Sequence, residues 1–348
     1  MHTSPLVSII TPVFNRESYI KETIRGVLNQ TYENWEWIIF DDGSTDNTRN
    51  IIMDVRDVRI RYVFQENMGP YHLVKTFNKA LSMSSGKLIA MLDSDDYWPD
   101  YKIQVQVKNF DSPDIVLSYG ECFVINENGN MVQYIALPAD PHVANNDPVG
   151  SSLKLFLLQR SNFVANSTVM LDKEALLSIG GFVEAKGLWQ DYPTWTRLSL
   201  EGTFAANPLC LGYRRLHLSS TSYAGYEALM ESGFTFLREF VMSNSQKLID
   251  LGFSYDRDVL EEHWKRLNPY ASYYTRAIVA LSCGKFKEAK AAFRKFLEKD
   301  SSLKQKIIYF LVVLSSFLQF DLVNPLASLK VKLTKNAGLS RNFFNRSS

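Results

Sequence analysis

Short apolar runs alternate with segments of helical periodicity through the first hundred residues of the chain. The apolar runs predict strands at residues 7–14, 35–42, 59–65 and 87–96. The segments between them predict helices at residues 18–30, 44–55 and 71–84. Nearly continuous apolar strands separated by helices are typical of a mainly parallel sheet that is covered on both faces. The pattern therefore predicts an α/β fold.

The pattern is less regular after residue 110. Further strands are predicted at residues 114–126 and 130–138, a polar loop at 139–150, a helix at 152–160, and a strand, turn and short helix within 163–182. From about residue 226 the periodicity is helical almost without a break. We therefore expect a boundary near residue 225, with an α/β domain at 1–225 and a helical region at 226–348.

Bulk properties exclude several classes of protein. The net charge of +1 argues against a broad nucleic-acid-binding surface. The three cysteines are scattered, and no two have the spacing of a zinc or redox site, which favours a reducing compartment. The first apolar run has no basic segment before it and soon turns polar, so it is expected to be a strand rather than a signal peptide. These features predict a cytoplasmic protein without a nucleic-acid partner.

Polar clusters follow three of the predicted strands: PVFN at 12–15, DDGS at 41–44 and DSDD at 93–96. In parallel sheets, ligands bind beyond the carboxyl ends of the strands. Neighbouring carboxylates repel one another, and a hard divalent cation removes that cost. The crowded aspartates of DSDD therefore indicate a metal site, although a solvated turn or a helix cap would also explain them.

The chain lacks the glycine motifs that usually cradle phosphates. There is no G-x-G-x-x-G after the first strand and no G-x-x-x-x-G-K-[ST] in the sequence. A nucleotide diphosphate bound here would then need a metal bridge, which the DSDD carboxylates could provide.

Three segments carry a resemblance to a known family: TPVFNRESYIKETIRGVLNQTYENWEWIIFDDGSTDNT, MLDSDDYW and GLWQDYPTWTRL. In order and spacing they resemble family 2 glycosyltransferases of the GT-A fold, over about residues 6–222. The resemblance implies a Rossmann-like, mainly parallel sheet with flanking helices. It also implies inverting transfer of a sugar from a nucleotide-diphospho-sugar to an acceptor hydroxyl, in the synthesis of cell-surface polysaccharide or glycoconjugates.

The same resemblance implies roles for individual residues. The expected donor-binding residues are Pro12, Phe14, Asn15, Asp41, Asp42, Asn67, Gly69, Asn78, Asp93, Arg215 and His217. Asp41 or Asp42 would bond the base or ribose, and Asp42 is the better candidate for a structural role at the turn. Asp93 would face the ribose, and Asp95, with Asp93 beside it, would hold Mg²⁺ or Mn²⁺.

The resemblance also implies that Asp191 is the general base. The family usually has an acidic pair there, whereas here Gln190 replaces the first acid. A neutral neighbour suits a single base that must stay deprotonated. The alternative is that Asp191 caps the following helix, which Pro193 would fit. Arg215 and His217 match a segment that closes over the diphosphate, although a basic surface turn is an alternative for them.

The helical region contains two further signals. Residues 270–300 resemble one tetratricopeptide-type hairpin, which would pack on its neighbours or bind a partner. The apolar run at 306–320 is too short for a confident membrane span and fits either a core helix or a membrane-associating helix. From Leu322 onward there are five basic residues and no acid. A membrane-associating segment at 303–348 would suit peripheral contact with an anionic inner leaflet and a glycan or lipid-linked glycan acceptor.

Two other functions remain open from the residues alone. A sugar nucleotidyltransferase would share the sheet and the metal, but it usually has a glycine-rich basic loop after the first strand. A non-catalytic sugar-nucleotide-binding or interaction protein would not need the carboxylates Asp95 and Asp191 that this chain retains.

Overall fold

The computed structural model describes residues 4–69, 72–138, 151–159, 163–185, 190–217, 220, 226–253, 271–298, 302–318 and 323. The predicted loop at 139–150, residues 186–189 before Asp191, and the basic tail after residue 323 lie outside these ranges.

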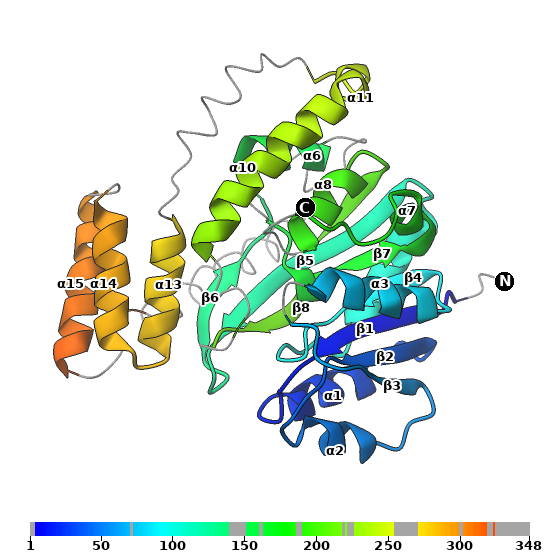
Figure 1. Cartoon of the computed structure of the whole chain (residues 1–348), viewed down its shortest axis with the longest axis horizontal. Helices are drawn as coiled ribbons and strands as arrows, with labels where there is room; N and C mark the ends of the chain where they lie inside the picture. Colours follow the sequence, from blue (N-terminus) through cyan, green and yellow to red (C-terminus); the bar gives the residue numbers. More distant parts are fainter. Residues whose placement is uncertain are drawn as a thin grey trace, which may run out of the picture. The chain divides into compact units, whose positions relative to one another are not determined.

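The first four strands form a parallel sheet (Figure 1). They are β1 (Val7–Val13), β2 (Trp35–Asp41), β3 (Ile60–Phe64) and β4 (Leu88–Met91), in the spatial order β3-β2-β1-β4. Val7 of β1 pairs with Trp35 on one side and with Leu88 on the other. This register aligns the carboxyl ends of β1, β2 and β4 at one edge of the sheet.

The sheet continues past β4 with the opposite strand direction. β7 (Met170–Asp172) pairs antiparallel with β4, and β5 (Ile115–Ile125) pairs antiparallel with β7. β6 (Met131–Ile135) follows β5 in the order, and β8 (Thr203–Arg215) pairs with β5. The sheet is therefore mixed, and the predicted parallel arrangement holds for its first four strands.

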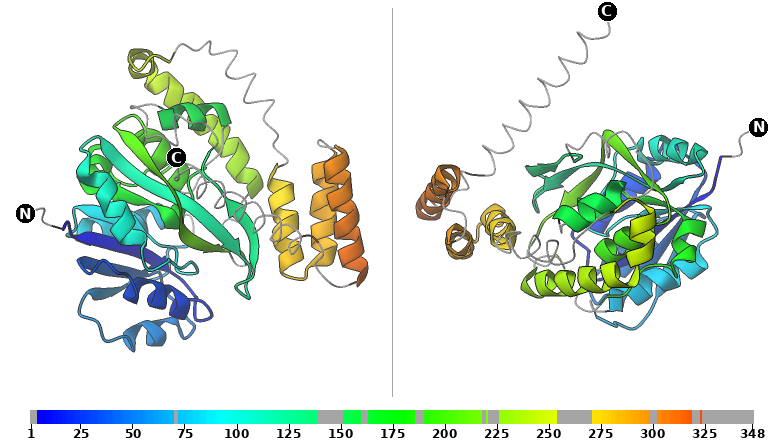
Figure 2. Two further views of the ribbon diagram at one scale, coloured as in Figure 1. Left: turned by 180° about the vertical axis from the view of Figure 1, so that it is seen from behind. Right: turned by 90° about the horizontal axis from the view of Figure 1, so that it is seen from above.

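Helices cover both faces of the sheet because successive side chains of a strand point to opposite sides. Ile9 belongs to a core with α1 (Ile20–Leu28), α2 (Thr48–Met53) and α4 (Lys102–Val107). Its neighbour Ile10 belongs to a second core with the remaining helices of this part of the chain (Figures 1 and 2). Those helices are α3 (Leu73–Met83), α6 (Ser151–Gln159), α7 (Lys173–Ser178), α8 (Asp191–Leu198), α10 (Tyr226–Ser243) and α11 (Ser245–Asp250).

Several elements were not predicted. The short helices α4 and η2 (Lys108–Asp111) give too few turns for a periodic signal, and β8 contains Asn207 and Pro208 in place of a clean alternation. The 3₁₀ turn η3 (Asn166–Thr168) stands at the start of the segment in which only a strand, a turn and a helix were expected.

The chain divides into two compact units, and the division is not the single boundary expected near residue 225. Unit 1 comprises residues 1–122, 136–214 and 228–267, and unit 2 comprises 123–135, 215–227 and 268–348. The helices α10 and α11 pack on the second core of the sheet through Phe236, Phe240 and Leu248, so they belong to unit 1. Sequence periodicity marks where helices begin but not which core they join.

Unit 2 contains α13 (Ala271–Ser282), α14 (Phe286–Leu297) and α15 (Leu303–Leu318), which lie side by side in Figures 1 and 2. α13 and α14 form a helical pair over the residues where the sequence suggests a hairpin. Ala277, Leu281, Ala289 and Phe293 are buried between them, and Val312 of α15 joins the same core. No helix within the described residues has the length and apolarity needed to cross a membrane.

Candidate functional site

The predicted strand-end clusters meet at one edge of the sheet. Val13 at the end of β1 pairs with Asp41 at the end of β2. The Asn15 N–H donates to Ser44 Oγ at 3.0 Å, and Arg16 Nε donates to Asp95 Oδ2 at 3.2 Å. These contacts join the segments that follow β1, β2 and β4, which lie far apart in the sequence.

The segment after β1 is shaped by Asn15. This is the one non-glycine residue with positive φ (49°) among those described. Its Oδ1 accepts from the Thr45 N–H at 2.8 Å, which braces the β1 end against the β2 end. Phe14 beside it is 42% exposed, an unusual position for an aromatic ring at a buried strand end, whereas Pro12 is half-buried. An exposed ring here offers a flat apolar surface to a ligand.

The two acids after β2 differ in how far their carboxylates are used by the protein, and Asp41 rather than Asp42 has the structural role. Asp41 is fully buried, and both of its oxygens are used, by the Ser44 N–H at 2.8 Å and by the Tyr62 hydroxyl at 2.6 Å. Asp42 is half-buried, and its Oδ1 accepts from Gln65 Nε2 and from the Met68 N–H. Its Oδ2 has no hydrogen-bond partner among the described residues. Asp41 is thus the structural acid, and Asp42 is the one with an oxygen left for a ligand.

The segment after β3 lies against this turn. Asn67 Nδ2 donates to the Asp42 carbonyl at 2.7 Å. Gly43 has a φ of 81°, and a Cβ on it would lie 2.7 Å from the Asn67 nitrogen, so only glycine allows this approach. Gly69 also has positive φ (79°) and open space beside it.

Both ends of the Asn78 side-chain amide bind the protein backbone. Its Nδ2 donates to the Phe182 carbonyl at 2.9 Å, and its Oδ1 accepts from the Phe182 N–H at 2.8 Å. The side chain therefore clamps the backbone of the segment that leads toward Asp191.

The DSDD segment is held by η3, which the sequence did not single out. Asn166 Nδ2 donates to Asp93 Oδ1 at 2.9 Å, and Ser167 Oγ accepts from the Asp93 N–H at 3.2 Å. The Ser167 hydroxyl donates to the buried Asp96 carboxylate. Asp96 is therefore a structural acid, and the turn of η3 fixes where Asp93 points.

Four charged groups act on one another beside this turn. Burial, and after it the charge of Asp95, raise the pKa of Asp93 to about 6. The hydrogen bond from Asn166 and the charge of Arg214 lower this pKa, and the charge of Asp191 raises it. Asp191 is almost one hundred residues away in sequence, yet its charge reaches Asp93. The predicted base is thus near enough for its charge to act on a predicted metal ligand, although the three carboxylates do not form one metal-holding group among the described residues. We call Asp93, Asp95 and Asp191 the acidic cluster.

Asp191 is the first residue of α8, and Gln190 occupies the cap position that the sequence suggested for Asp191. Asp191 Oδ1 accepts from the Tyr192 N–H at 2.8 Å. A carboxylate at a helix N-terminus is stabilised in its ionised form. Gln190 is 4% exposed, and its Oε1 has no hydrogen-bond partner in the described part of the chain.

The cation at this cluster is Arg214 rather than the predicted Arg215. Side chains alternate along a strand, so the two arginines leave β8 on opposite sides. Arg214 acts on Asp93, whereas Arg215 Nη1 donates to the carbonyls of Asn126 and Glu127 at 3.1 and 3.3 Å. Arg215 and His217 are both buried in unit 2, and the His217 N–H donates to Ser220 Oγ.

A stacked tyrosine pair attaches the end of β8 to the DSDD loop. The rings of Tyr97 and Tyr213 lie 4.4 Å apart and nearly parallel, and the two backbones exchange hydrogen bonds of 3.2 and 2.9 Å. This bridge places Arg214, the neighbour of Tyr213, beside the acidic cluster.

The donor atoms of the cluster fit a hard divalent cation. Asp93 and Asp95 offer carboxylate oxygens, and Asn166 Oδ1 is a buried oxygen without a hydrogen-bond partner among the described residues. No three His, Cys, Asp or Glu side chains in those residues gather closely enough to hold a metal by themselves. Mg²⁺ is typically bound through one or two carboxylates together with substrate phosphates, so two carboxylates are the expected number.

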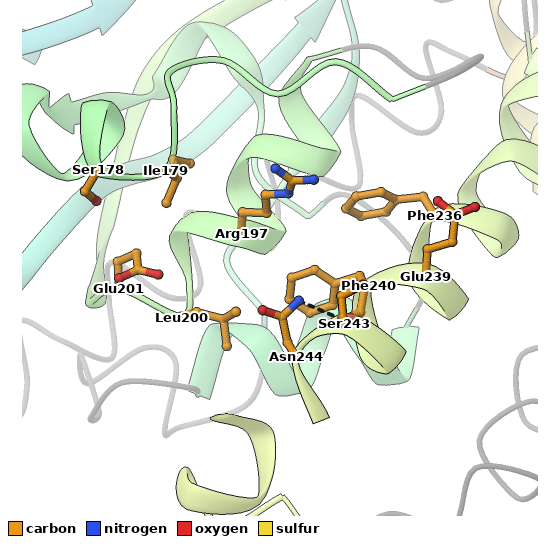
Figure 3. A pocket seen from close by; sticks show the side chains of 10 residues that line it. All are labelled: Ser178, Ile179, Arg197, Leu200, Glu201, Phe236, Glu239, Phe240, Ser243 and Asn244. Atoms are coloured by element: carbon orange, nitrogen blue, oxygen red, sulfur yellow. Dashed lines mark hydrogen bonds between the residues drawn. The ribbon is translucent and has the colours of Figure 1, made fainter. Parts of the chain in front are cut away.

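A cavity of about 400 Å³ lies elsewhere in unit 1, between α7, α8 and α10 (Figure 3). Arg197, Phe236 and Glu239 are among the side chains that line it. None of the predicted site residues lines this cavity, so it is separate from the acidic cluster.

Comparisons with known proteins identify the family of the chain. Residues 8–176 match the family described as glycosyl transferase family 2. The putative teichuronic acid biosynthesis glycosyltransferase TuaG of Bacillus subtilis (strain 168) is 31% identical over 240 residues, which is 67% of this chain and 87% of TuaG. The Escherichia coli UDP-Glc:alpha-D-GlcNAc-diphosphoundecaprenol beta-1,3-glucosyltransferase WfaP is 32% identical over 226 residues, covering 65% of this chain and 83% of WfaP.

The fold has a counterpart among solved structures. The mannosyltransferase PcManGT of Pyrobaculum calidifontis, in complex with GDP-Man and Mn²⁺, superposes with a TM-score of 0.53 at 15% identity, over 91% of this chain and 88% of that one. At that identity the likeness concerns the fold. The strand-end motifs, the acidic cluster and the relatives together lead to one conclusion: the chain belongs to glycosyl transferase family 2.

Proposed function

We propose that this glycosyltransferase moves a sugar from a nucleotide-diphospho-sugar to a hydroxyl of a glycan acceptor, with inversion at the anomeric carbon. The observation that carries the proposal is the meeting of the segments after β1, β2 and β4 at one edge of the sheet, where Asn15 contacts Ser44 and Arg16 contacts Asp95. The charge of Asp191 also raises the pKa of Asp93 at this edge. A base and a diphosphate-binding pair must lie close together, because the acceptor attacks the carbon that the diphosphate leaves.

Different residues have different roles in the proposed reaction. Asp191 takes the proton of the acceptor hydroxyl, and the hydrogen bond from the Tyr192 N–H at the first turn of α8 fixes the direction of its carboxylate. Phe14 and the Asp42 Oδ2 oxygen bind the base and ribose. Arg214 contributes positive charge beside Asp93, where negative charge develops on the leaving group.

Asp95 and Asp93 would hold Mg²⁺ or Mn²⁺, with Asn166 Oδ1 as a further oxygen. When bound, such a cation neutralises charge on the nucleoside diphosphate and so makes it a better leaving group. The Mn²⁺ in the PcManGT complex supports a divalent cation as the class of metal. Arg16, which donates to Asp95 at 3.2 Å, holds that carboxylate in place.

The acceptor that we propose is a lipid-linked glycan, used at the inner face of the cytoplasmic membrane during synthesis of a cell-surface polysaccharide. WfaP and its Escherichia coli counterpart WfgD, which is 39% identical over 131 residues, are named for acceptors carried on diphosphoundecaprenol. All members of the acidic cluster belong to unit 1, so we assign catalysis to unit 1 and leave unit 2 for attachment or partner binding.

The test compares the purified protein with its Asp191→Asn variant on a panel of nucleotide-sugars in the presence of Mn²⁺. Loss of the base should lower donor turnover by about 10²-fold or more, while the rise in melting temperature caused by the free nucleotide is retained. The exposed Asp111 in η2 provides the control substitution Asp111→Asn, which should leave turnover unchanged.

Three results would contradict the proposal. The first is normal turnover by Asp191→Asn, and the second is a product that keeps the anomeric configuration of the donor. The third is release of pyrophosphate from a nucleoside triphosphate and a sugar phosphate, which is the reaction of a nucleotidyltransferase.

A further inference from the structure

Helix α15 is apolar on two opposite sides. One side faces the core of unit 2, where Val312 and Ser315 are fully buried and Ile308 and Tyr309 pack beside them. The other side carries large apolar side chains that are in solvent. They are Ile307 (54% exposed), Phe310 (64%), Phe317 (84%) and Leu318 (53%).

These four positions share one face of the helix. Residues that are three, seven or eight positions apart lie on the same side of an α-helix. Phe310 is three positions after Ile307, seven before Phe317 and eight before Leu318. Single exposed apolar residues are ordinary on protein surfaces, but a continuous apolar face marks a site of interaction. We call the four residues the α15 face.

The part of the sequence that contains α15 is strongly basic. Residues 271–348 contain fourteen basic residues (lysine or arginine) and four acidic residues. Residues 1–270 contain twenty-four basic residues and thirty-three acidic residues. The small net charge of the whole chain is therefore the sum of an acidic part, residues 1–270, and a basic part, residues 271–348. Lys306 is exposed next to Ile307, and Lys287, Lys290 and Arg294 are exposed on α14. After Asp321 the sequence has five basic residues and no acid.

This charge decides which partner fits the α15 face. A second copy of the chain would bring the same positive charge and would be repelled. An anionic bilayer offers negative headgroups for the cations and an apolar interior for the phenylalanines. Sixteen helical residues with one side in a protein core are suited to lying in the plane of the bilayer surface.

We infer that the α15 face docks unit 2 on an anionic phospholipid bilayer, with the aromatic and aliphatic side chains below the headgroups and the cations of α14 and of Lys306 among them. This inference deepens the proposed function, since it names the surface through which an enzyme with a lipid-linked acceptor would reach the membrane. It concerns binding alone, and its test needs no acceptor.

The test is co-sedimentation of the full-length protein with two kinds of vesicles, phosphatidylcholine alone and phosphatidylcholine with phosphatidylglycerol. The protein should bind the second kind and not the first, and added salt should weaken the binding. The double variant Phe310→Ser/Phe317→Ser should reduce the apparent affinity by at least about tenfold. The variant Lys287→Glu/Arg294→Glu should reduce it as well.

Two controls make the result interpretable. The variant Met53→Ser/Val58→Ser removes apolar side chains that are exposed in unit 1, and it should bind like the unchanged protein. Hydrolysis of the nucleotide-sugar donor without vesicles should be the same in all variants, so a failure of docking is distinguishable from a failure of the proposed activity.

The inference is overturned if the Phe310→Ser/Phe317→Ser variant binds vesicles as well as the unchanged protein, or if the unchanged protein binds neither kind of vesicle. It is also overturned if neutral and anionic vesicles bind equally. A dimer that becomes a monomer in the double variant would assign the α15 face to a second copy instead.

Discussion

Replacing Asp93 by asparagine should stabilise the ligand-free protein while removing one of the two carboxylates that we propose as metal ligands. The pKa of Asp93 is raised from 3.8 to about 6 by burial and by Asp95. Two pKa units correspond to about 3 kcal/mol at most, so keeping Asp93 ionised costs the folded state about 1–3 kcal/mol near pH 8. Asparagine has the same shape, carries no charge, and still offers an oxygen to Asn166 Nδ2.

The sign of the pH dependence follows from the direction of the shift. The folded-state pKa lies above the unfolded one, so the stabilising effect of the protonated group is complete below pH 4. It is lost as pH rises through 6. The gain from Asp93→Asn should therefore be full at pH 7–8, about half as large near pH 5, and close to zero at pH 4.

The assay is urea unfolding of the unchanged protein and the variant at pH 8 and pH 5, in the presence of a chelator so that no divalent cation is bound. The control is Asp111→Asn, at an exposed aspartate whose stability change should be small and independent of pH. A gain for Asp93→Asn that is absent, or that is equal at both pH values, would refute the electrostatic reasoning about the acidic cluster.

Three further substitutions test other parts of the structure. Asn78→Ala removes both hydrogen bonds to the Phe182 backbone and should lower the free energy of unfolding by about 1–3 kcal/mol, measured with urea; an unchanged midpoint would show that the clamp is not needed. Phe14→Ala should weaken nucleotide binding by about tenfold in calorimetry while leaving the melting temperature nearly unchanged, because the ring is 42% exposed; unchanged affinity would remove Phe14 from the donor site. Trp195→Ala empties a fully buried position in the core of unit 1 and should cost about 3–5 kcal/mol in urea unfolding; a cost below about 1 kcal/mol would mean that this core is not closely packed.

The sequence carried enough information for the fold class, the family and the edge of the sheet at which the candidate site lies. The alternation of apolar runs and helical segments is a local signal, and it predicted β1, β2 and β3 to within one residue at each end. It placed the end of β4 too late, at residue 96, whereas β4 ends at Met91. The strand-end motifs have a fixed order and spacing, so the family could be identified from them, and the comparisons confirm it. The DSDD segment could be recognised because three aspartates directly follow an apolar run in the sequence.

Other roles could be read only from contacts. Asn166 and Ser167 bind the DSDD loop from more than seventy positions away, and nothing in their local sequence marks them. The alternation along β8 could have separated Arg214 from Arg215, but β8 itself gave too weak a strand signal for the alternation to be used.

The sequence by itself determined which chemical groups this protein has and the local elements that carry them, because helix and strand periodicity and motif spacing depend on near neighbours in the chain. Only the tertiary structure decided which of those groups work together. Both carboxylate oxygens of Asp41 accept hydrogen bonds, from Tyr62 and Ser44, and Asn78 binds the Phe182 backbone. The charge of Asp191 raises the pKa of Asp93. Burial, hydrogen-bond partners and charge–charge interactions depend on distances in space, and the register of the sheet and the packing of helices on it set those distances.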